Sequence, residues 1–167
     1  MRRVMIIGGP GSGKSTLARR IGARLDLPVT HLDQIYWEPG WVFREHEDVR
    51  DRLLALYAAE DWVIDGNYSI TWPERLARAD TLIFLDLPTW IRAPRVIRRT
   101  VTGFGRDRPD LTPGCPERFD WIFYRFVFTY GLRRRKRALA QLRAAPDHVA
   151  CHHLTRPAEI ERFVSAL

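Results

Sequence analysis

Residues 8–15 read Gly8-Gly9-Pro10-Gly11-Ser12-Gly13-Lys14-Ser15, and this stretch decides the fold. It satisfies the pattern G-x-x-x-x-G-K-[ST] at every position. The apolar run Val4–Ile7 precedes it and predicts a buried strand, and the residues after it have the apolar spacing of a helix as far as Leu25. Strand, glycine loop and helix in that order are the context that a phosphate-binding P-loop requires.

Each residue type in this loop has a chemical reason. Glycines let the backbone turn so that several N–H groups point at one anion, and the following helix adds the positive end of its dipole. Lys14 is expected to reach the β- and γ-phosphates of a nucleotide, and the Ser15 hydroxyl is expected to ligate Mg²⁺. The predicted nucleotide-binding residues of the loop are Gly8, Gly9, Pro10, Gly11, Ser12, Gly13, Lys14, Ser15 and Thr16.

The composition is typical of one globular domain. The chain has 167 residues, of which 46% are hydrophobic, so a single domain spanning residues 1–167 is expected. The longest apolar stretch, residues 121–132, is interrupted by Arg125 and is too short to cross a bilayer. No leader peptide is apparent before the first strand, and the two cysteines lie far apart, so a reduced cytoplasm is the expected location.

The positive charge is concentrated in one segment. The net charge is +7, but residues 92–143 carry fourteen basic and four acidic residues. A localised positive field attracts phosphate groups, whether on a nucleotide or on a nucleic acid.

Five apolar runs alternate with helical patterns, which predicts a parallel sheet with helices on both faces. The predicted strands are Val4–Ile7, Val29–Leu32, Trp62–Ile64, Thr81–Leu87 and His148–Leu154. The predicted helices are Lys14–Leu25, Glu45–Glu60, Pro73–Ala79, Thr89–Thr102, residues 116–144 and Pro157–Leu167, the last with Thr155 as its cap. Residues 103–116 are rich in Gly, Pro and charge, which predicts a mobile loop.

Three of the predicted strands have an aspartate at their end or directly after it. Asp33 and Asp65 come directly after the second and third runs, and Asp86 lies at the end of the fourth. Ligands bind at the carboxyl ends of the strands in such sheets, where carboxylates serve Mg²⁺ and an attacking hydroxyl. Asp33 and Asp65 are the favoured functional residues because neither is needed to begin a helix. For Asp86, capping of the next turn is an equally good interpretation.

The P-loop, the Asp65-Gly66 pair and the strand end Leu85–Pro88 resemble the adenylate kinase and shikimate kinase group of small P-loop kinases. A narrower resemblance, to the adenylate-kinase-like family called DNA topology modulation proteins, is carried by His31-Leu32-Asp33, Trp37-Glu38-Pro39-Gly40-Trp41, residues 62–68, Arg108-Pro109-Asp110 and residues 114–120. The resemblance implies a nucleoside- and shikimate-kinase-like P-loop core with five parallel strands in the order 2-3-1-4-5. It also implies a lid at about residues 103–117 and an acceptor-side helical insertion at about residues 34–60.

The resemblance assigns roles to particular side chains. Asp65 would hold Mg²⁺ through water, and Asp33 would either take the proton of the acceptor hydroxyl or position that hydroxyl. Arg118 resembles the arginine at the exit of the lid, and Arg125 follows it at a spacing of two helical turns. The arginines implied near the transferring phosphoryl group are Arg99, Arg106, Arg108, Arg118 and Arg125.

The acceptor side departs from the adenylate kinase pattern. That pattern continues Asp-Gly-Phe-Pro-Arg, whereas Asp65-Gly66 is followed here by Asn67-Tyr68-Ser69, so AMP is a doubtful acceptor. Arg75 is the nearest substitute for the missing arginine. The aromatic residues 36–41 would stack on a base or a sugar, or form a turn packed on the next helix. The predicted acceptor-binding residues are Asp33, Trp37, Asn67, Tyr68 and Arg75.

The sequence therefore favours a phosphotransferase that uses ATP and Mg²⁺ and acts on a small-molecule or nucleotide acceptor. The alternative is an ATP-dependent nucleic-acid-binding protein, since the basic run Arg133–Arg137 lies beside many aromatic residues. A nucleotide sensor or a hydrolase without an acceptor is a third reading. The residues do not name the acceptor, the preferred nucleotide or the oligomeric state.

Overall fold

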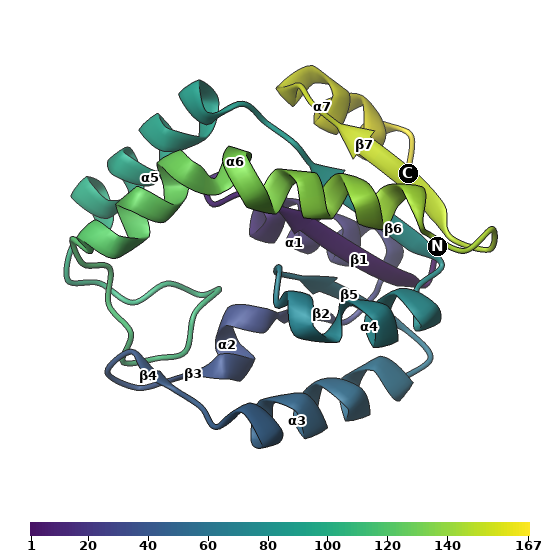
Figure 1. Cartoon of the computed structure of the whole chain (residues 1–167), viewed down its shortest axis with the longest axis horizontal. Coiled ribbons are helices and arrows are strands. Elements are labelled where there is room, and N and C mark those ends of the chain that lie inside the picture. Colours follow the sequence, from purple (N-terminus) through teal and green to yellow (C-terminus); the bar gives the residue numbers. More distant parts are fainter.

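The central element is a five-stranded parallel sheet with the strand order β2-β5-β1-β6-β7 (Figure 1). The computed structural model describes all 167 residues, except for the side chain of Arg133. The strands are β1 (Arg3–Gly8), β2 (Val29–His31), β5 (Trp62–Asp65), β6 (Thr81–Leu85) and β7 (Ala150–Leu154). Numbered along the chain, this order is 2-3-1-4-5, so the predicted topology is confirmed.

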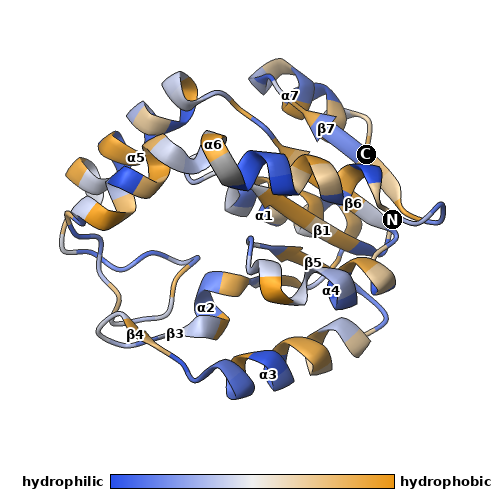
Figure 2. Ribbon diagram, viewed as in Figure 1, coloured by the Kyte–Doolittle hydropathy of each residue, from blue (hydrophilic) through white to orange (hydrophobic). Residues whose placement is uncertain are grey.

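Both faces of the sheet are covered because its central strands are apolar on both sides (Figure 2). Val4 and Ile6 of β1 pack with α1 and α7, whereas Met5 and Ile7 face α3, α4 and α6. These covering helices are α1 (Lys14–Leu25), α7 (Pro157–Ser165), α3 (His46–Ala58), α4 (Trp72–Arg78) and α6 (Trp121–Arg143). None of the helices described has the length and apolarity needed to cross a bilayer.

Local hydrogen bonds set two helix starts differently from the prediction. Helix α6 begins at Trp121 rather than near residue 116, because the Asp120 carboxylate accepts the N–H of Phe123 at 3.1 Å. Thr155 was predicted to cap α7, but the N-cap residue is Arg156. The Glu159 carboxylate accepts the N–H of Thr155 at 2.7 Å and so draws this residue out of the helix.

Residues 34–60 are not wholly helical, contrary to the prediction. Helix α2 (Leu32–Tyr36) leads into a two-stranded hairpin of β3 (Trp37–Glu38) and β4 (Val42–Phe43), and α3 follows. The turn needs left-handed backbone at Gly40 and Trp41, with φ of 81° and 63°. Strands of two residues are too short to show an alternating pattern, so the sequence could not reveal this hairpin.

Helix α5 (Thr89–Gly103) and helix α6 are joined by residues 104–120, called here the α5–α6 connection. It has no helix of its own, and Figure 1 shows it running from the end of α5 towards the hairpin and back to α6. Its hydrogen bonds to the hairpin include Gly40 N–H to Gly114 O at 2.8 Å and Trp41 Nε1–H to Pro116 O at 3.1 Å. The connection thus closes one side of the space beyond the strand ends.

Candidate active site

The carboxyl ends of β1, β2 and β5 open into a cleft of about 1140 Å³. Its walls come from the P-loop, α2, the hairpin, the segment after β5, and the α5–α6 connection. Ligands of parallel sheets bind at this edge. Among the predicted site residues, the cleft is lined by Pro10, Gly11, Ser12, Gly13, Lys14, Ser15, Thr16, Asp33, Trp37, Asp65, Asn67, Tyr68, Arg99, Arg108 and Arg118.

The P-loop has the backbone that its glycines were predicted to provide. Gly11 and Gly13 adopt φ of 75° and 96°, a region that favours glycine. A Cβ on Gly11 would lie 2.5 Å from the carbonyl oxygen of Arg92, whereas nothing lies within 4 Å of a Cβ on Gly13. The loop is therefore packed on α5 on one side and open to the cleft on the other, a shape that fits a phosphate group.

Arg92 supports this loop from behind and was not predicted to have a role. Its side chain is 2% exposed, with Nε–H donating to Leu87 O at 2.8 Å and an Nη1–H donating to Pro10 O at 3.0 Å. Arg92 is one of many arginines in the sequence, so nothing in the sequence indicated this role.

Lys14 lies at the first position of α1, where the backbone N–H groups have no intrahelical acceptors. Its Nζ donates to Gly9 O at 3.2 Å across the loop. Burial lowers the pKa of Lys14, while the charges of Asp65 and Asp33 oppose that shift. A partly desolvated ammonium beside free N–H groups is suited to bind an anion.

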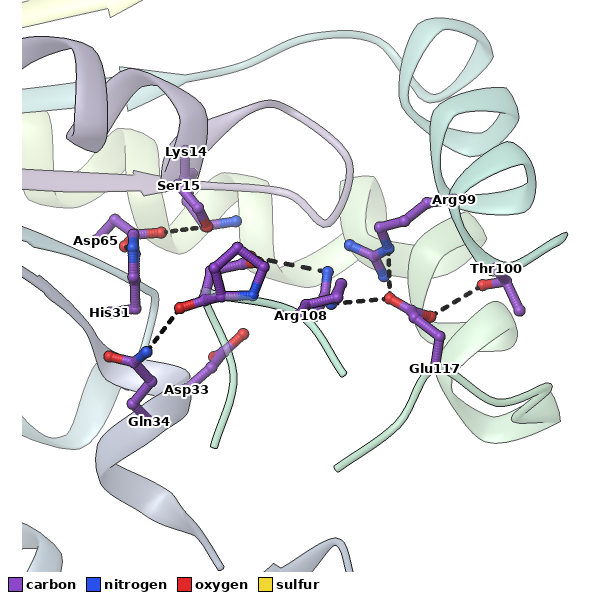
Figure 3. A network of polar contacts seen from close by, with 12 residues as sticks. Lys14, Ser15, His31, Asp33, Gln34, Asp65, Arg99, Thr100, Arg108 and Glu117 are labelled. Atoms are coloured by element: carbon purple, nitrogen blue, oxygen red, sulfur yellow. Dashed lines mark hydrogen bonds and ion pairs between the residues drawn. The ribbon is translucent and has the colours of Figure 1, made fainter. Parts of the chain in front are cut away.

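Ser15 and Asp65, the predicted metal residues, lie together in the structure (Figure 3). The Ser15 hydroxyl donates to Asp65 Oδ2 at 2.8 Å, and His31 Nδ1 contacts the other carboxylate oxygen. Burial opposes protonation of His31, but the hydrogen bond and charge of Asp65 outweigh it and raise the pKa of His31. His31 thus orients Asp65 towards Ser15, and the sequence did not indicate this role because it depends on the β2–β5 register.

The oxygen donors here fit Mg²⁺, which binds proteins through one or two carboxylates and completes its shell with water and phosphate oxygens. Asp110 of the α5–α6 connection adds a third oxygen group beside Ser15. Burial opposes its ionisation, but Arg108 and the Ser15 hydroxyl together lower the pKa of Asp110. The sequence did not predict that this aspartate would approach the P-loop.

Asp33 lies in the first turn of α2 rather than at the end of β2, so it does occupy a helix start, contrary to expectation. Its carboxylate is half-buried and accepts the hydroxyl of Tyr36. Burial raises the pKa of Asp33, and the Tyr36 hydrogen bond and the Lys14 charge only partly oppose this shift. A carboxylate of raised pKa at the wall of the cleft is suited to accept a proton.

Asn67 holds the P-loop in place instead of presenting its amide to an acceptor. Gly8 N–H donates to Asn67 Oδ1 at 3.1 Å, and Asn67 Nδ2–H donates to Gly8 O at 2.8 Å. Gly8 itself lies behind the cleft wall, and Gly9 is likewise not part of the lining. Asn67 lines the cleft, so its contact with the acceptor stays a prediction, but both polar atoms of its amide are already hydrogen-bonded to Gly8.

Replacing Asn67 with alanine removes both hydrogen bonds to Gly8. Each bond contributes about 0.5–1.5 kcal/mol, so we expect a loss of about 1–3 kcal/mol in unfolding free energy by urea denaturation. Asn67→Asp keeps an acceptor for the Gly8 N–H but places an oxygen against Gly8 O, so it should not restore stability. Wild-type stability in both variants would show that the clamp is unimportant.

Arg99 and Arg108 converge on the buried carboxylate of Glu117 (Figure 3). Their Nε atoms lie 2.8 and 2.9 Å from Glu117 Oε1, and the Thr100 hydroxyl donates to Oε2 at 3.3 Å. Arg108 Nη1 also lies 3.7 Å from Asp110 Oδ2, so the two guanidinium groups face two carboxylates beside the phosphate end of the cleft. The sequence did not indicate a role for Glu117, because only the fold brings it close to Arg99 of α5 and to Arg108 of the α5–α6 connection.

Glu117→Gln removes the charge partner of Arg99 and leaves Arg108 with Asp110 alone, at 3.7 Å. Breaking a fully buried pair costs about 3–5 kcal/mol, but the arginine side chains keep 33% and 16% exposure, so we expect about 1–3 kcal/mol. ATP should then raise the melting temperature of this variant more than that of the wild type. Glu47→Gln, an exposed glutamate on α3, is the control; equal effects of the two changes would contradict the assigned contacts.

Three predicted side chains lie outside the cleft. Arg75 is fully buried and donates an Nη2–H to Gly66 O at 3.0 Å, so it does not replace the missing acceptor arginine. Arg106 and Arg125 are exposed and do not line the cleft. Arg118 precedes α6, so the helical spacing that paired it with Arg125 does not apply.

Asp86 has a structural role, but it is not the capping of the next turn that was one of its two interpretations. Its carboxylate accepts Arg135 Nε–H at 2.8 Å and lies 2.8 Å from His153 Nε2. It is buried beneath α6 and β7 and is not part of the cleft lining.

Aromatic side chains cover the wall opposite the P-loop and are called here the aromatic wall. Ring centroids of neighbouring members lie 5.4–5.8 Å apart, as in packed aromatic pairs. The five members, all in the cleft lining, are Tyr36, Trp37, Trp41, Phe43 and Tyr68. Arg118 stacks over Trp41, with its guanidinium carbon 5.2 Å from the ring centroid.

Comparisons with known proteins agree with this architecture. A shikimate kinase of Nitratidesulfovibrio vulgaris is 35% identical over 127 residues, which cover 66% of this chain and 70% of that protein. Adenylate kinase 2 of Nostoc sp. is 27% identical over 150 residues, covering 73% and 78% of the two chains. No family model matches the sequence.

The crystal structure of shikimate kinase from Bacteroides thetaiotaomicron superposes with a TM-score of 0.59, covering 99% of this chain and 95% of that one. Its 18% identity makes this evidence of fold alone. The sequence relatives and the P-loop cleft together establish the relationship. The chain belongs to the family of small P-loop kinases that includes the shikimate and adenylate kinases.

Proposed function

We propose that the protein transfers the γ-phosphoryl group of ATP, bound with Mg²⁺, to a hydroxyl group of a small acceptor. One observation carries the proposal: Lys14, the Ser15–Asp65 pair and the Asp33 carboxylate line the same cleft. Lys14, Ser15 and Asp65 have the groups that bind a nucleotide phosphate and its metal, and Asp33 has a carboxylate that can accept a proton. The similar proteins include adenylate, cytidylate and shikimate kinases, which supports this reaction class.

Each residue then has a role in positioning or in electrostatic stabilisation. The loop N–H groups and Lys14 would bind the β- and γ-phosphates, and Ser15 would hold Mg²⁺ with Asp65 acting through water. When bound, Mg²⁺ neutralises charge on the phosphate oxygens. Arg99 and Arg108 would stabilise the transferring group, because both line the cleft together with the P-loop and carry guanidinium donors. Arg118 would assist them from the other side.

The α5–α6 connection, with its predicted lid at residues 103–117, would exclude water from the reaction. Gln34 of α2 donates to Pro109 O at 2.8 Å, and the Thr112 hydroxyl donates to Trp37 O at 2.7 Å. These contacts bring Arg108 and Asp110 over the P-loop. Exclusion of water favours transfer to an alcohol over hydrolysis of ATP.

Contacts of the basic run favour this function over nucleic-acid binding. Arg135 pairs with Asp86, an Arg137 Nη1–H donates to the Ser69 hydroxyl at 3.2 Å, and Arg134 is part of the cleft lining. These three side chains thus serve the fold and the cleft. All three side chains are exposed to solvent, but each has a partner or a place within the protein itself.

Phosphoryl transfer can be measured directly. The purified protein is incubated with Mg²⁺, ATP labelled at the γ-phosphate, and candidate nucleosides, nucleotides and sugars. We expect the label to move to one acceptor, with little release of free phosphate. Calorimetry without any acceptor should detect binding of Mg²⁺-ATP. Absence of binding heat would contradict the proposal, as would exclusive release of free phosphate in the presence of every acceptor.

A further inference from the structure

The acceptor end of the cleft is rich in aromatic surface. The five members of the aromatic wall are partly or substantially exposed, with Phe43 at 42%. They come from the end of α2, the hairpin and the segment after β5, so three separate parts of the chain place them together. Exposed flat rings at the wall of a cleft offer a stacking surface for another ring.

Three arginines lie near this wall. Arg75 is buried behind Gly66 and lies outside the cleft. Arg44 pairs with Glu38 at 2.9 Å and with Asp48 at 3.1 Å, and its Nε–H donates to Ile35 O. Arg118 lies flat over Trp41 and 3.8 Å from Asp120. Arg75 does not reach the cleft, although its Nε and Nη1 atoms have no hydrogen-bond partner, and Arg44 is paired with two carboxylates. Arg118 remains 53% exposed, but the proposed function already assigns it to the transferring phosphoryl group and not to the acceptor.

Two other polar side chains belong to the wall or lie beside it. Asp33 lies at its edge and accepts the Tyr36 hydroxyl, and the Tyr68 hydroxyl lies 3.2 Å from His46 Nδ1. A negatively charged acceptor would be repelled by Asp33 and would gain no bidentate arginine contact. A neutral alcohol would suffer no such repulsion and could donate its hydroxyl hydrogen to Asp33.

The inference from these observations extends the proposed function and rests on it. We infer that the acceptor is an uncharged ring compound bearing a free alcohol, such as a nucleoside or a sugar, stacked on the aromatic wall. In the reaction, the alcohol oxygen bonds to the γ-phosphorus while the bond from that phosphorus to the β–γ bridging oxygen breaks. ADP leaves with that electron pair, and the hydroxyl proton passes to Asp33.

Matched acceptor pairs that differ in charge test the inference. The neutral members are adenosine, cytidine, guanosine, uridine, thymidine, glucose and methyl shikimate. Their anionic partners are the five nucleoside 5′-monophosphates, gluconate and shikimate. At saturating Mg²⁺-ATP, we expect at least one neutral member to exceed its anionic partner at least 30-fold in kcat/KM. An active pair that favours the anion overturns the inference, as does the absence of turnover with every neutral member.

The two proposals fail in different ways. If Mg²⁺-ATP binds and an anion is the better acceptor, the inference is wrong while the proposed phosphotransfer stands. If calorimetry detects no Mg²⁺-ATP binding, the proposed function itself is wrong.

A substitution in the aromatic wall provides an independent measurement. Trp37→Leu keeps an apolar side chain but removes the ring, and we expect the KM of the neutral acceptor to rise roughly tenfold, as for loss of base stacking. The KM of ATP should not change, and Trp37→Phe should restore most of the acceptor affinity. Trp90→Leu, at a tryptophan that is 75% exposed on α5 and outside the cleft, is the control. An unchanged acceptor KM in Trp37→Leu overturns the stacking contact.

Discussion

Lys14→Ala is expected to lower the rate of phosphoryl transfer by roughly 10²–10³-fold, the range for loss of one positioned electrostatic group. Lys14 begins α1, its Nζ lies 3.2 Å from Gly9 O across the loop, and it belongs to the cleft lining. Its positive charge would stabilise the transition state most strongly, because negative charge accumulates on the transferring phosphoryl group there. The measurement is the initial rate of ADP formation with saturating ATP and acceptor.

Stability separates this effect from misfolding. Burial lowers the pKa of Lys14, and Arg99 and Arg92 lower it further, so the folded protein without nucleotide disfavours the charged form. Removing that ammonium should therefore leave the melting temperature without ATP nearly unchanged. Lys136→Ala is the matched control, because Lys136 is the other lysine of the chain and is exposed on α6. A Lys14→Ala enzyme of wild-type rate would refute the proposed phosphate contact.

Asp33→Asn is expected to reduce the rate of transfer by roughly 10²–10⁴-fold, the usual contribution of a general base. The amide still accepts the Tyr36 hydroxyl but cannot take the proton of the acceptor. A carboxyl group must be ionised to act as a base, and burial raises the pKa of Asp33. As the pH is lowered, the wild-type rate should therefore begin to fall at a higher pH than it would with an exposed aspartate as the base. This acid limb of the pH–rate profile should disappear in Asp33→Asn.

The same shift of the pKa predicts the effect on folding. Because the folded state raises the pKa of Asp33, the ionised carboxylate costs stability at pH values above that pKa. Asp33→Asn should therefore be at least as stable as the wild type at neutral pH. Asp51→Asn, at an exposed residue of α3, should change neither rate nor stability. A variant that keeps the wild-type rate and acid limb would show that Asp33 is not the base.

Local sequence patterns were enough to predict the sheet and the phosphate end of the cleft. The P-loop motif fixes a strand, a turn and a helix within 25 residues, so its geometry depends on neighbours in the chain. Apolar runs located all five strands of the sheet. The central strands β1, β5 and β6 are buried on both faces and so exclude polar residues, whereas the edge strand β7 is largely exposed. Asp65 followed from the same reasoning, since parallel strands end at a common edge.

The acceptor end could not be predicted in the same way, because its side chains are placed by contacts between distant parts of the chain. Arg75 was predicted to reach the cleft from its position in sequence, yet α4 packs against the sheet and turns it inward to Gly66. Asn67 was assigned to the acceptor, but the pairing of β5 with β1 brings it to Gly8.

The sequence by itself determined the P-loop, the α/β sheet and the kinase family to which the chain belongs. Only the tertiary structure decided that Glu117 gathers Arg99 and Arg108, that His31 orients Asp65, and that a hairpin presents the aromatic wall. The physical reason is the range of the interactions. Backbone turns and apolar periodicity are set by adjacent residues, whereas ion pairs and ring stacking join residues that meet only after the sheet has formed.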